Sequence, residues 1–102
     1  MTGLLSISVA QEGPADVVAV TGEVDLSNCE ELADAIVTLN GARIVVVDLT
    51  LCTFFDSSCL GVLVRCANRA AEAGTSFTVR ANEHGRKVIE LTNLTEKLGV
   101  AP

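Results

Sequence analysis

The sequence predicts a single α/β domain, in which a mixed sheet of four or five strands has its helices packed mainly on one side. The 102 residues suffice for one hydrophobic core and leave no room for a second. Aromatic residues make up only 3% of the chain, so the core must be built from small aliphatic side chains. Segments with the two-residue period of strands and segments with helical spacing follow one another in the order β-β-α-β-α-β-α.

Four strands are expected. Residues 5–9 alternate apolar and polar side chains, and residues 17–20 follow a turn, so these two segments predict a hairpin. Residues 43–49 are almost continuously apolar and β-branched, which is typical of a strand covered on both faces. Residues 75–80 alternate again and, with residues 43–49, flank a helix, so these two strands should run parallel. Residues 94–100 suggest a short turn, and a fifth strand at the sheet edge is left open for them.

Three helices are expected between and after these strands. The first covers residues 27–40 and opens with a serine and a glutamate at the spacing of a capping box. A loop over residues 50–55 leads to the second helix, residues 56–73, which Gly74 ends. The third helix begins at an Asn-Glu pair and covers residues 82–91.

Charge and composition exclude several classes of function. The net charge is −6 and the sequence contains no block of Lys or Arg, which argues against direct contact with nucleic acid and favours a basic protein surface as partner. We recognise no secretory signal in the sequence, because its start lacks the positive charge followed by a long apolar run that marks one. The apolar run at residues 44–47 is too short to cross a bilayer. We therefore expect a soluble, cytoplasmic protein that does not enter a membrane.

The cysteines predict no metal site. Four are present, none forms a C-x-x-C pair, and the single histidine, His84, has no cysteine beside it. We therefore expect neither zinc nor any other cofactor. In a cytoplasmic chain the thiols should be reduced and mostly buried.

The segment from Asp48 to Val64 carries the functional signal, centred on Asp56-Ser57-Ser58. Aspartate and serine are favoured at the first position of a helix, so capping alone would explain these three residues.

A longer pattern points further. The stretch from Val45 to Leu63, the upstream segment 22–26 (Gly-Glu-Val-Asp-Leu) and the helix end at residues 71–74 together resemble the STAS domain. In particular they are similar to the bacterial anti-sigma factor antagonists, and the resemblance covers nearly the whole chain. It implies a single STAS domain over residues 1–102.

The resemblance also implies a switch in transcription and stress response. In that family the unphosphorylated protein binds an anti-sigma factor, which is also a serine kinase of the histidine-kinase-like ATPase class, and thereby frees a sigma factor. The kinase phosphorylates the serine after the motif's aspartate, the antagonist lets go, and a serine phosphatase reverses the modification. Carried over by position, the acceptor is Ser57, with Ser58 as second candidate. A monomer or weak dimer is expected.

Partner contacts are expected around the acceptor and along the helix that follows it. Glu23 and Asp25 belong to a loop that the resemblance places nearby, although a solvated charge and a helix cap are their simpler interpretations. Four further side chains form a stripe that we expect to be offset from the core face of the helix, namely Cys59, Val62, Cys66 and Arg69. The candidate contacts are Asp56, Ser57, Ser58, Cys59, Val62, Cys66, Glu23 and Asp25.

Cys59 departs from the family pattern, which usually reads Asp-Ser-Ser/Thr-Gly-Leu-Gly. A side chain in place of that glycine could alter the fit of a partner or hinder phosphorylation, and should stabilise the helix modestly. Two interpretations of the thiol stay open: a small buried apolar group, or a redox input joined by Cys52, because a thiolate is stabilised at a helix N-terminus. Of Phe54 and Phe55, one should be core and the other an exposed contact.

Two other functions remain as alternatives. One is a different STAS role, as a subunit of a lipid transporter or as a signalling scaffold. The other is an enzyme, which the sequence does not favour, because Ser57 has no evident base and no nucleophile-elbow pattern is present.

Overall fold

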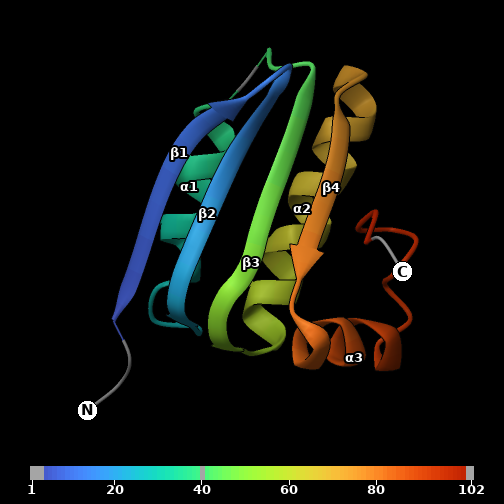
Figure 1. Ribbon diagram of the computed structural model, residues 1–102. Helices are drawn as coiled ribbons and strands as arrows, with labels where there is room; N and C mark the ends of the chain where they lie inside the picture. The colour runs from blue at the N-terminus through green and yellow to red at the C-terminus, as the bar shows by residue number, and fades with distance from the viewer. Residues whose placement is uncertain (1–3, 40, 101–102) are drawn as a thin grey trace.

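Four strands form one mixed sheet in the order β1-β2-β3-β4, in a computed structural model that describes residues 4–39 and 41–100 (Figure 1). β1 and β2 form the predicted antiparallel hairpin, while β2 with β3 and β3 with β4 run parallel. The predicted mixed topology is confirmed, with four strands among the described residues. Their bounds are Leu5–Glu12 for β1, Ala15–Val24 for β2, Ile44–Phe55 for β3 and Ser76–Ala81 for β4.

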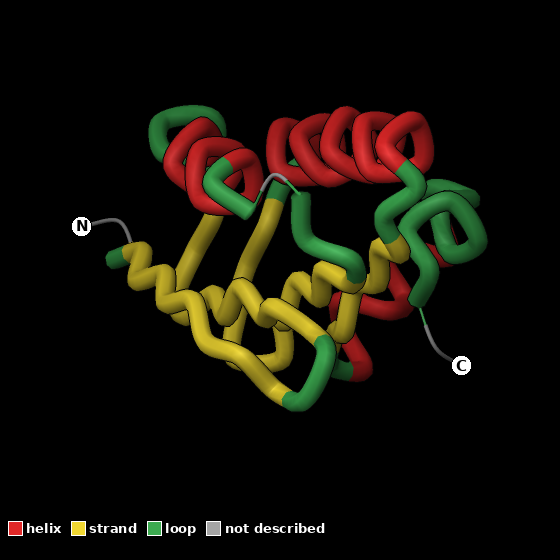
Figure 2. The backbone as a smooth tube through the Cα atoms, turned by 90° about the horizontal axis from the view of Figure 1, so that it is seen from above, coloured by secondary structure: helices red, strands yellow, loops and turns green. Residues whose placement is uncertain are grey.

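Helices α1 (Cys29–Val37) and α2 (Ser57–Ala73) lie side by side on one face of the sheet, whereas α3 (Glu83–Leu91) lies across the end where β3 and β4 finish (Figures 1 and 2). The predicted one-sided packing is confirmed. No helix within the described residues has the length and apolar character needed to span a bilayer.

The core lies between the sheet and this helix pair, and it consists of aliphatic side chains, as the composition predicts. Valines from β2, β3 and β4 meet leucines and isoleucines from the helices. The largest side chains that are fully buried are Leu32, Leu49, Leu63, Ile89, Leu98, Val18, Val20, Val24, Val47, Val79 and Cys59.

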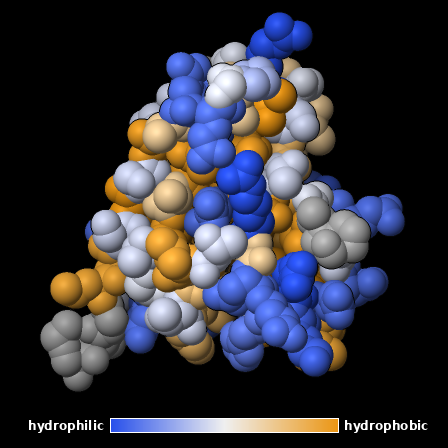
Figure 3. Space-filling view, viewed as in Figure 1, coloured by the Kyte–Doolittle hydropathy of each residue, from blue (hydrophilic) through white to orange (hydrophobic). Residues whose placement is uncertain are grey.

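The opposite face of the sheet is open, and it mixes polar and hydrophobic side chains, with a group of hydrophilic residues near its middle (Figure 3). Arg80 of β4 lies on this face 3.4 Å from the carboxylate of Glu12 and 3.9 Å from that of Asp48. Exposed ion pairs of this kind contribute little to stability, so the fold depends on the covered face.

The predicted loop over residues 50–55 is wrong, because these residues continue β3 as far as Phe55. Their partner is the end of β2, where Gly22 pairs with Cys52 after one register shift and Val24 pairs with Phe55 after a second. The bulges let the extended strand keep Cys52 buried while Thr53 stays exposed. The long-range ladder with β2, which local composition does not reveal, explains the difference.

The short turn expected within residues 94–100 is confirmed, but the possible fifth strand there is wrong, because the segment forms turns. This segment nevertheless covers the edge of β4, since the Val79 amide donates to the Leu98 carbonyl at 3.0 Å. Gly99 has a φ of +63° and passes so close to β4 that an added Cβ would lie 2.6 Å from the Phe77 carbonyl oxygen. The segment therefore shields the edge of β4 from pairing with another strand, although it forms no regular ladder of hydrogen bonds with β4 itself.

The ends of α1 differ from the prediction as well. The helix begins at Cys29, and its first flanking residue, Asn28, makes no side-chain cap. The predicted capping box is wrong because the Ser27 amide and hydroxyl both donate to the carboxylate of Asp25 instead. The helix ends at Val37, and the expected stop at Asn40 lies outside the described residues. By contrast, Gly74 ends α2 in a left-handed conformation, as predicted.

Candidate functional site

The N-terminus of α2 is built around the carboxylate of Asp56. One residue separates the end of β3 from the helix, and Asp56 occupies it in an extended conformation. Its Oδ1 accepts from the Ser58 amide at 2.9 Å and from the Cys59 amide at 3.4 Å. Asp56 is therefore the helix cap, which confirms the capping role that its residue type predicts.

Asp56 also holds the hydroxyl of Ser58, which donates to Oδ1 at 2.7 Å. This hydrogen bond, assisted by the amides of Cys59, Ser58 and Leu26, holds the pKa of Asp56 below its ordinary value against a smaller opposing effect of desolvation. The site therefore carries a fixed negative charge at neutral pH.

Ser57 and Ser58 differ sharply in availability. The Ser57 side chain is exposed, and its hydroxyl makes no hydrogen bond with any described residue. Ser58 is half-buried, and its hydroxyl hydrogen is engaged by Asp56. A group that approaches from solvent meets the Ser57 oxygen first.

The loop between β2 and α1 lies next to this turn. The Asp56 amide donates to the Val24 carbonyl at 3.2 Å, and the Leu26 amide helps to stabilise the Asp56 charge. Asp25 is half-buried and organises the loop, and its own amide donates to the side chain of Asn28 at 2.9 Å. Glu23 is also half-buried, and its carbonyl accepts from the Asn28 side-chain amide at 3.0 Å. The structure thus brings Glu23 and Asp25 near the Asp56 turn.

Three other predicted contact residues point into the protein. Only 0% of Cys59, 3% of Val62 and 6% of Cys66 is exposed. The expected stripe offset from the core is wrong for these three, because α2 packs on both the sheet and α1 and therefore buries a wide arc of its surface. Its outer face near Ser57 carries Gly61 and Arg65 instead.

The buried thiol of Cys59 is poorly suited to redox chemistry. Burial, with smaller contributions from Cys52, Asp56 and Cys29, raises its pKa to about 12. Burial also raises the pKa of Cys52, whose thiol donates to the Phe54 carbonyl at 3.2 Å. The thiolate, which is the reactive form, is therefore strongly disfavoured at both positions, and the structure favours the apolar interpretation of Cys59.

Two exposed hydrophobic side chains lie on the segments that frame the turn. Leu26 is 79% exposed in the loop that donates its amide to Asp56, and Phe54 is 49% exposed two residues before Asp56. Phe55 packs against the core, so the expected division between the two phenylalanines is confirmed. Leu26 is not among the contacts predicted from the sequence, although a leucine within a polar turn is a visible signal.

Nothing in the described part of the chain resembles a metal centre, since no three His, Cys, Asp or Glu side chains are placed to hold an ion. The site offers a capped helix end, one free hydroxyl, a fixed carboxylate and two exposed hydrophobic residues. This combination suits recognition by another protein.

Comparison with solved structures shows the same fold. An anti-sigma factor antagonist from Mycobacterium paratuberculosis matches with a TM-score of 0.88 at 26% identity, over 97% of this chain and 86% of that one. The antagonist SpoIIAA in its unphosphorylated form matches with a TM-score of 0.76 at 19% identity, over 95% and 89% of the two chains. SpoIIAA from Bacillus in its phosphorylated form gives a TM-score of 0.67 at 22% identity, over 95% and 92%.

A search of curated proteins finds no significant match to this sequence. The family model described as "Mlab, STAS domain" matches residues 7–100, which is nearly the whole chain. The fold, the element order and this match agree with one another. The chain therefore belongs to the STAS domain family.

Proposed function

We propose that this protein is an anti-sigma factor antagonist that binds its partner while Ser57 is unmodified and releases it once Ser57 is phosphorylated. The observation that carries the proposal is the contrast at the start of α2: the Ser57 hydroxyl is exposed and unbonded, while that of Ser58 donates to Asp56. Similarity to a mycobacterial anti-sigma factor antagonist at 26% identity supports the same role.

The proposed partner is an anti-sigma factor that is also a serine kinase of the histidine-kinase-like ATPase class, and a serine phosphatase resets the switch. The docking surface consists of Ser57, the exposed part of Asp56, and the exposed side chains of Leu26 and Phe54. Two hydrophobic anchors around a polar centre resemble the composition of protein interfaces. Glu23 and Asp25 support this surface from the β2–α1 loop, and the buried Cys59, Val62 and Cys66 are not part of it.

Electrostatics explains why a phosphate would break the contact. Phosphorylation adds about −1.5 to −2 charges at pH 7. The neighbouring Asp56 is already charged, and its oxygen occupies the amides of Ser58 and Cys59. The phosphate therefore cannot be neutralised by those amides without displacing the cap, and it stays directed at the partner. The partner then meets two adjacent anions where it previously met one and a neutral hydroxyl.

In this proposed role the protein works in the cytoplasm as a monomer or weak dimer, and it has no catalytic activity of its own. Its effect on transcription is indirect, through the sigma factor that its partner releases.

The test uses candidate kinases of this class from the source organism with ATP, followed by mass mapping of the modified residue. We expect one phosphate on Ser57, none on Ser57→Ala, and normal modification of Ser58→Ala, which is the matched control. Ser57→Ala should bind the kinase as well as the wild type does, and Ser57→Asp should bind it at least tenfold more weakly. Equal binding of the two variants would refute the switch. Recovery of a membrane ATP-binding-cassette complex in pull-downs, without such a kinase, would instead favour the transporter-subunit role.

A further inference from the structure

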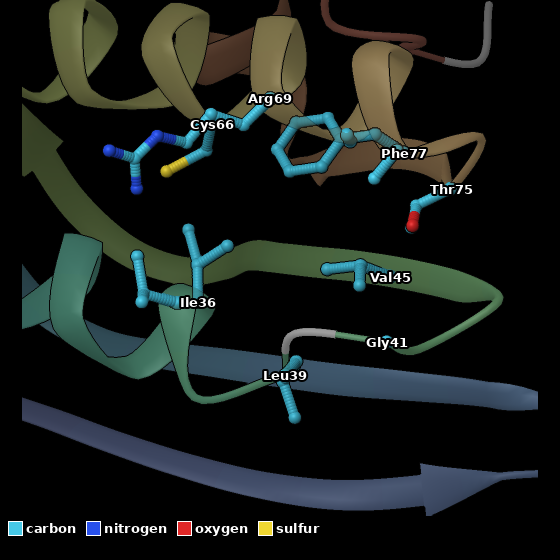
Figure 4. A pocket seen from close by; sticks show the side chains of 11 residues that line it. Ile36, Leu39, Gly41, Val45, Cys66, Arg69, Thr75 and Phe77 are labelled. Atoms are coloured by element: carbon cyan, nitrogen blue, oxygen red, sulfur yellow. The ribbon is translucent and has the colours of Figure 1, made fainter.

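A hollow lies between the C-terminal ends of α1 and α2, away from the Ser57 turn (Figure 4). Its volume is about 370 Å³, which is within the range of pockets that bind small organic molecules. The wall is mostly apolar, with contributions from the end of α1 and the segment after it, from the sheet, and from α2. The side chains that define it are Ile36, Leu39, Val45, Phe77, Cys66 and Arg69.

The unequal lengths of the two helices create this hollow. α1 has 9 residues and α2 has 17, so α2 extends about 12 Å further. Beyond the end of α1, the side chains of α2 that line the hollow include the small residues Ala70 and Ala73. Nothing among the described residues fills the space between them and Leu39, so an apolar surface of the core is accessible from outside.

Arg69 brings a positive charge to this apolar site. Its guanidinium forms no ion pair or hydrogen bond with any described residue. In Figure 4 the side chain runs back along α2, with its nitrogens beside the Cys66 sulfur. Consistent with this position, the charges of Arg65 and Arg69 partly offset the rise that burial causes in the pKa of Cys66. Arg65, one helical turn earlier, is already engaged by Glu30 at 3.2 Å.

We propose that the hollow is a binding site for a small amphipathic anion: an aliphatic chain of about ten carbons that ends in a carboxylate. The chain would lie between the helices against Ile36, Val45 and Phe77, where each buried methylene adds to the affinity. The planar guanidinium of Arg69 matches the two oxygens of a carboxylate. An overall charge of −6 repels anions in general, so selectivity for an anion here must come from Arg69.

The site is separate from the proposed switch. Ser57 and Arg69 are twelve positions apart on α2, a distance of about 18 Å along the axis. A ligand in the hollow would leave the docking surface around Ser57 uncovered. Its binding can therefore be measured on the isolated protein, whatever the identity of the protein partner.

The test titrates decanoate, below the concentration at which it forms micelles, into the protein while amide chemical shifts and heat are recorded. We expect saturable binding, with shifts confined to the ends of α1 and α2 and the adjacent parts of β3 and β4. Arg69→Gln should weaken binding at least fivefold, whereas Arg65→Gln, which removes the same charge from the same helix, should change it less than twofold. Decyltrimethylammonium, with the same tail and the opposite charge, should bind at least fivefold more weakly than decanoate.

A variant that fills the space provides a second measurement. Ala70→Phe should abolish decanoate binding, with its fold checked by circular dichroism. If it does not fold, Arg69→Gln still decides the question, because Arg69 is exposed. Absence of saturation, equal effects of Arg69→Gln and Arg65→Gln, equal binding of both charged probes, or unchanged binding by folded Ala70→Phe would each overturn the proposal.

Discussion

The Asp56 carboxylate holds the Ser58 hydroxyl at 2.7 Å while it caps α2 with the same oxygen. One side chain thus performs two tasks, because it fixes the start of the helix and decides which of two adjacent serines is free. Ser57 is therefore the available serine for two reasons: its side chain is exposed, and Asp56 binds the hydroxyl of Ser58 instead.

Loss of the cap should be measurable as a loss of stability. We expect Asp56→Ala to lower the free energy of unfolding by about 1 kcal/mol, the usual cost of removing an N-cap. Urea denaturation followed by circular dichroism measures this change. Asp34→Ala, at an exposed position on α1, is a control that should change the free energy by less than about 0.5 kcal/mol. Equal effects of the two substitutions would show that Asp56 does not stabilise the helix.

The contribution of Asp56 should depend on pH in a defined direction. The Ser58 hydroxyl and the helix amides lower its pKa in the folded protein. Its stabilising effect is therefore fully present above the ordinary pKa of aspartate, about 4, and is lost as the pH falls through the lower pKa of the folded state. The difference in unfolding free energy between wild type and Asp56→Ala should be larger at pH 7 than at pH 3. A difference of the same size at both would contradict the lowered pKa.

Replacement of Cys59 by the glycine usual in the family motif should destabilise the protein. We expect Cys59→Gly to cost about 2 kcal/mol, of which about 1 kcal/mol reflects helix propensity and the rest the lost burial of the thiol. Cys59→Ala removes only the second contribution and should cost about 1 kcal/mol. Because Cys59 is fully buried, neither variant should alter phosphorylation of Ser57. Thermal denaturation and the kinase assay measure the two effects separately.

Two glycines should respond in opposite ways to alanine. Gly22 has a φ of +103°, and an added Cβ would lie 1.8 Å from the Leu4 carbonyl oxygen, so Gly22→Ala forces β1 and β2 apart. We expect the free energy of unfolding to fall by roughly 2 kcal/mol or more, as is typical of backbone strain at such positions. Gly61, in the middle of α2, has nothing within 4 Å of its added Cβ, so Gly61→Ala should gain up to about 1 kcal/mol in helix propensity. Chemical denaturation of both variants tests the contrast, and a stabilised Gly22→Ala would refute it.

The sequence predicts the hairpin, the parallel crossover and the limits of α2 because each depends on local signals. Alternation marks β1 and β4, and Asp56 and Gly74 mark the two ends of α2. The end of β3 was missed because its extension depends on pairing with residues far away in the sequence, between Gly22 and Val24. No local pattern contains that information.

The functional site was predicted only in part, because some of its features also depend on residues outside the motif. Asp56 and Ser57 follow from the motif and from helix capping. The burial of Cys59, Val62 and Cys66 does not, because helical spacing gives the direction of a side chain but not how many neighbours surround the helix. Here the sheet and α1 together cover more of α2 than one apolar stripe requires. Nor does the motif reveal that Ser58 is bound by Asp56, since this depends on the rotamers of both side chains.

The single residue between β3 and α2 has a consequence for binding kinetics. A partner that meets Ser57 finds a position fixed by a 12-residue strand on one side and a 17-residue helix on the other. No loop has to be ordered at this point when the complex forms, so the entropic cost of association falls mainly on side chains such as Leu26 and Phe54. Association should therefore be fast, and the lifetime of the complex should be the quantity that a phosphate at Ser57 changes.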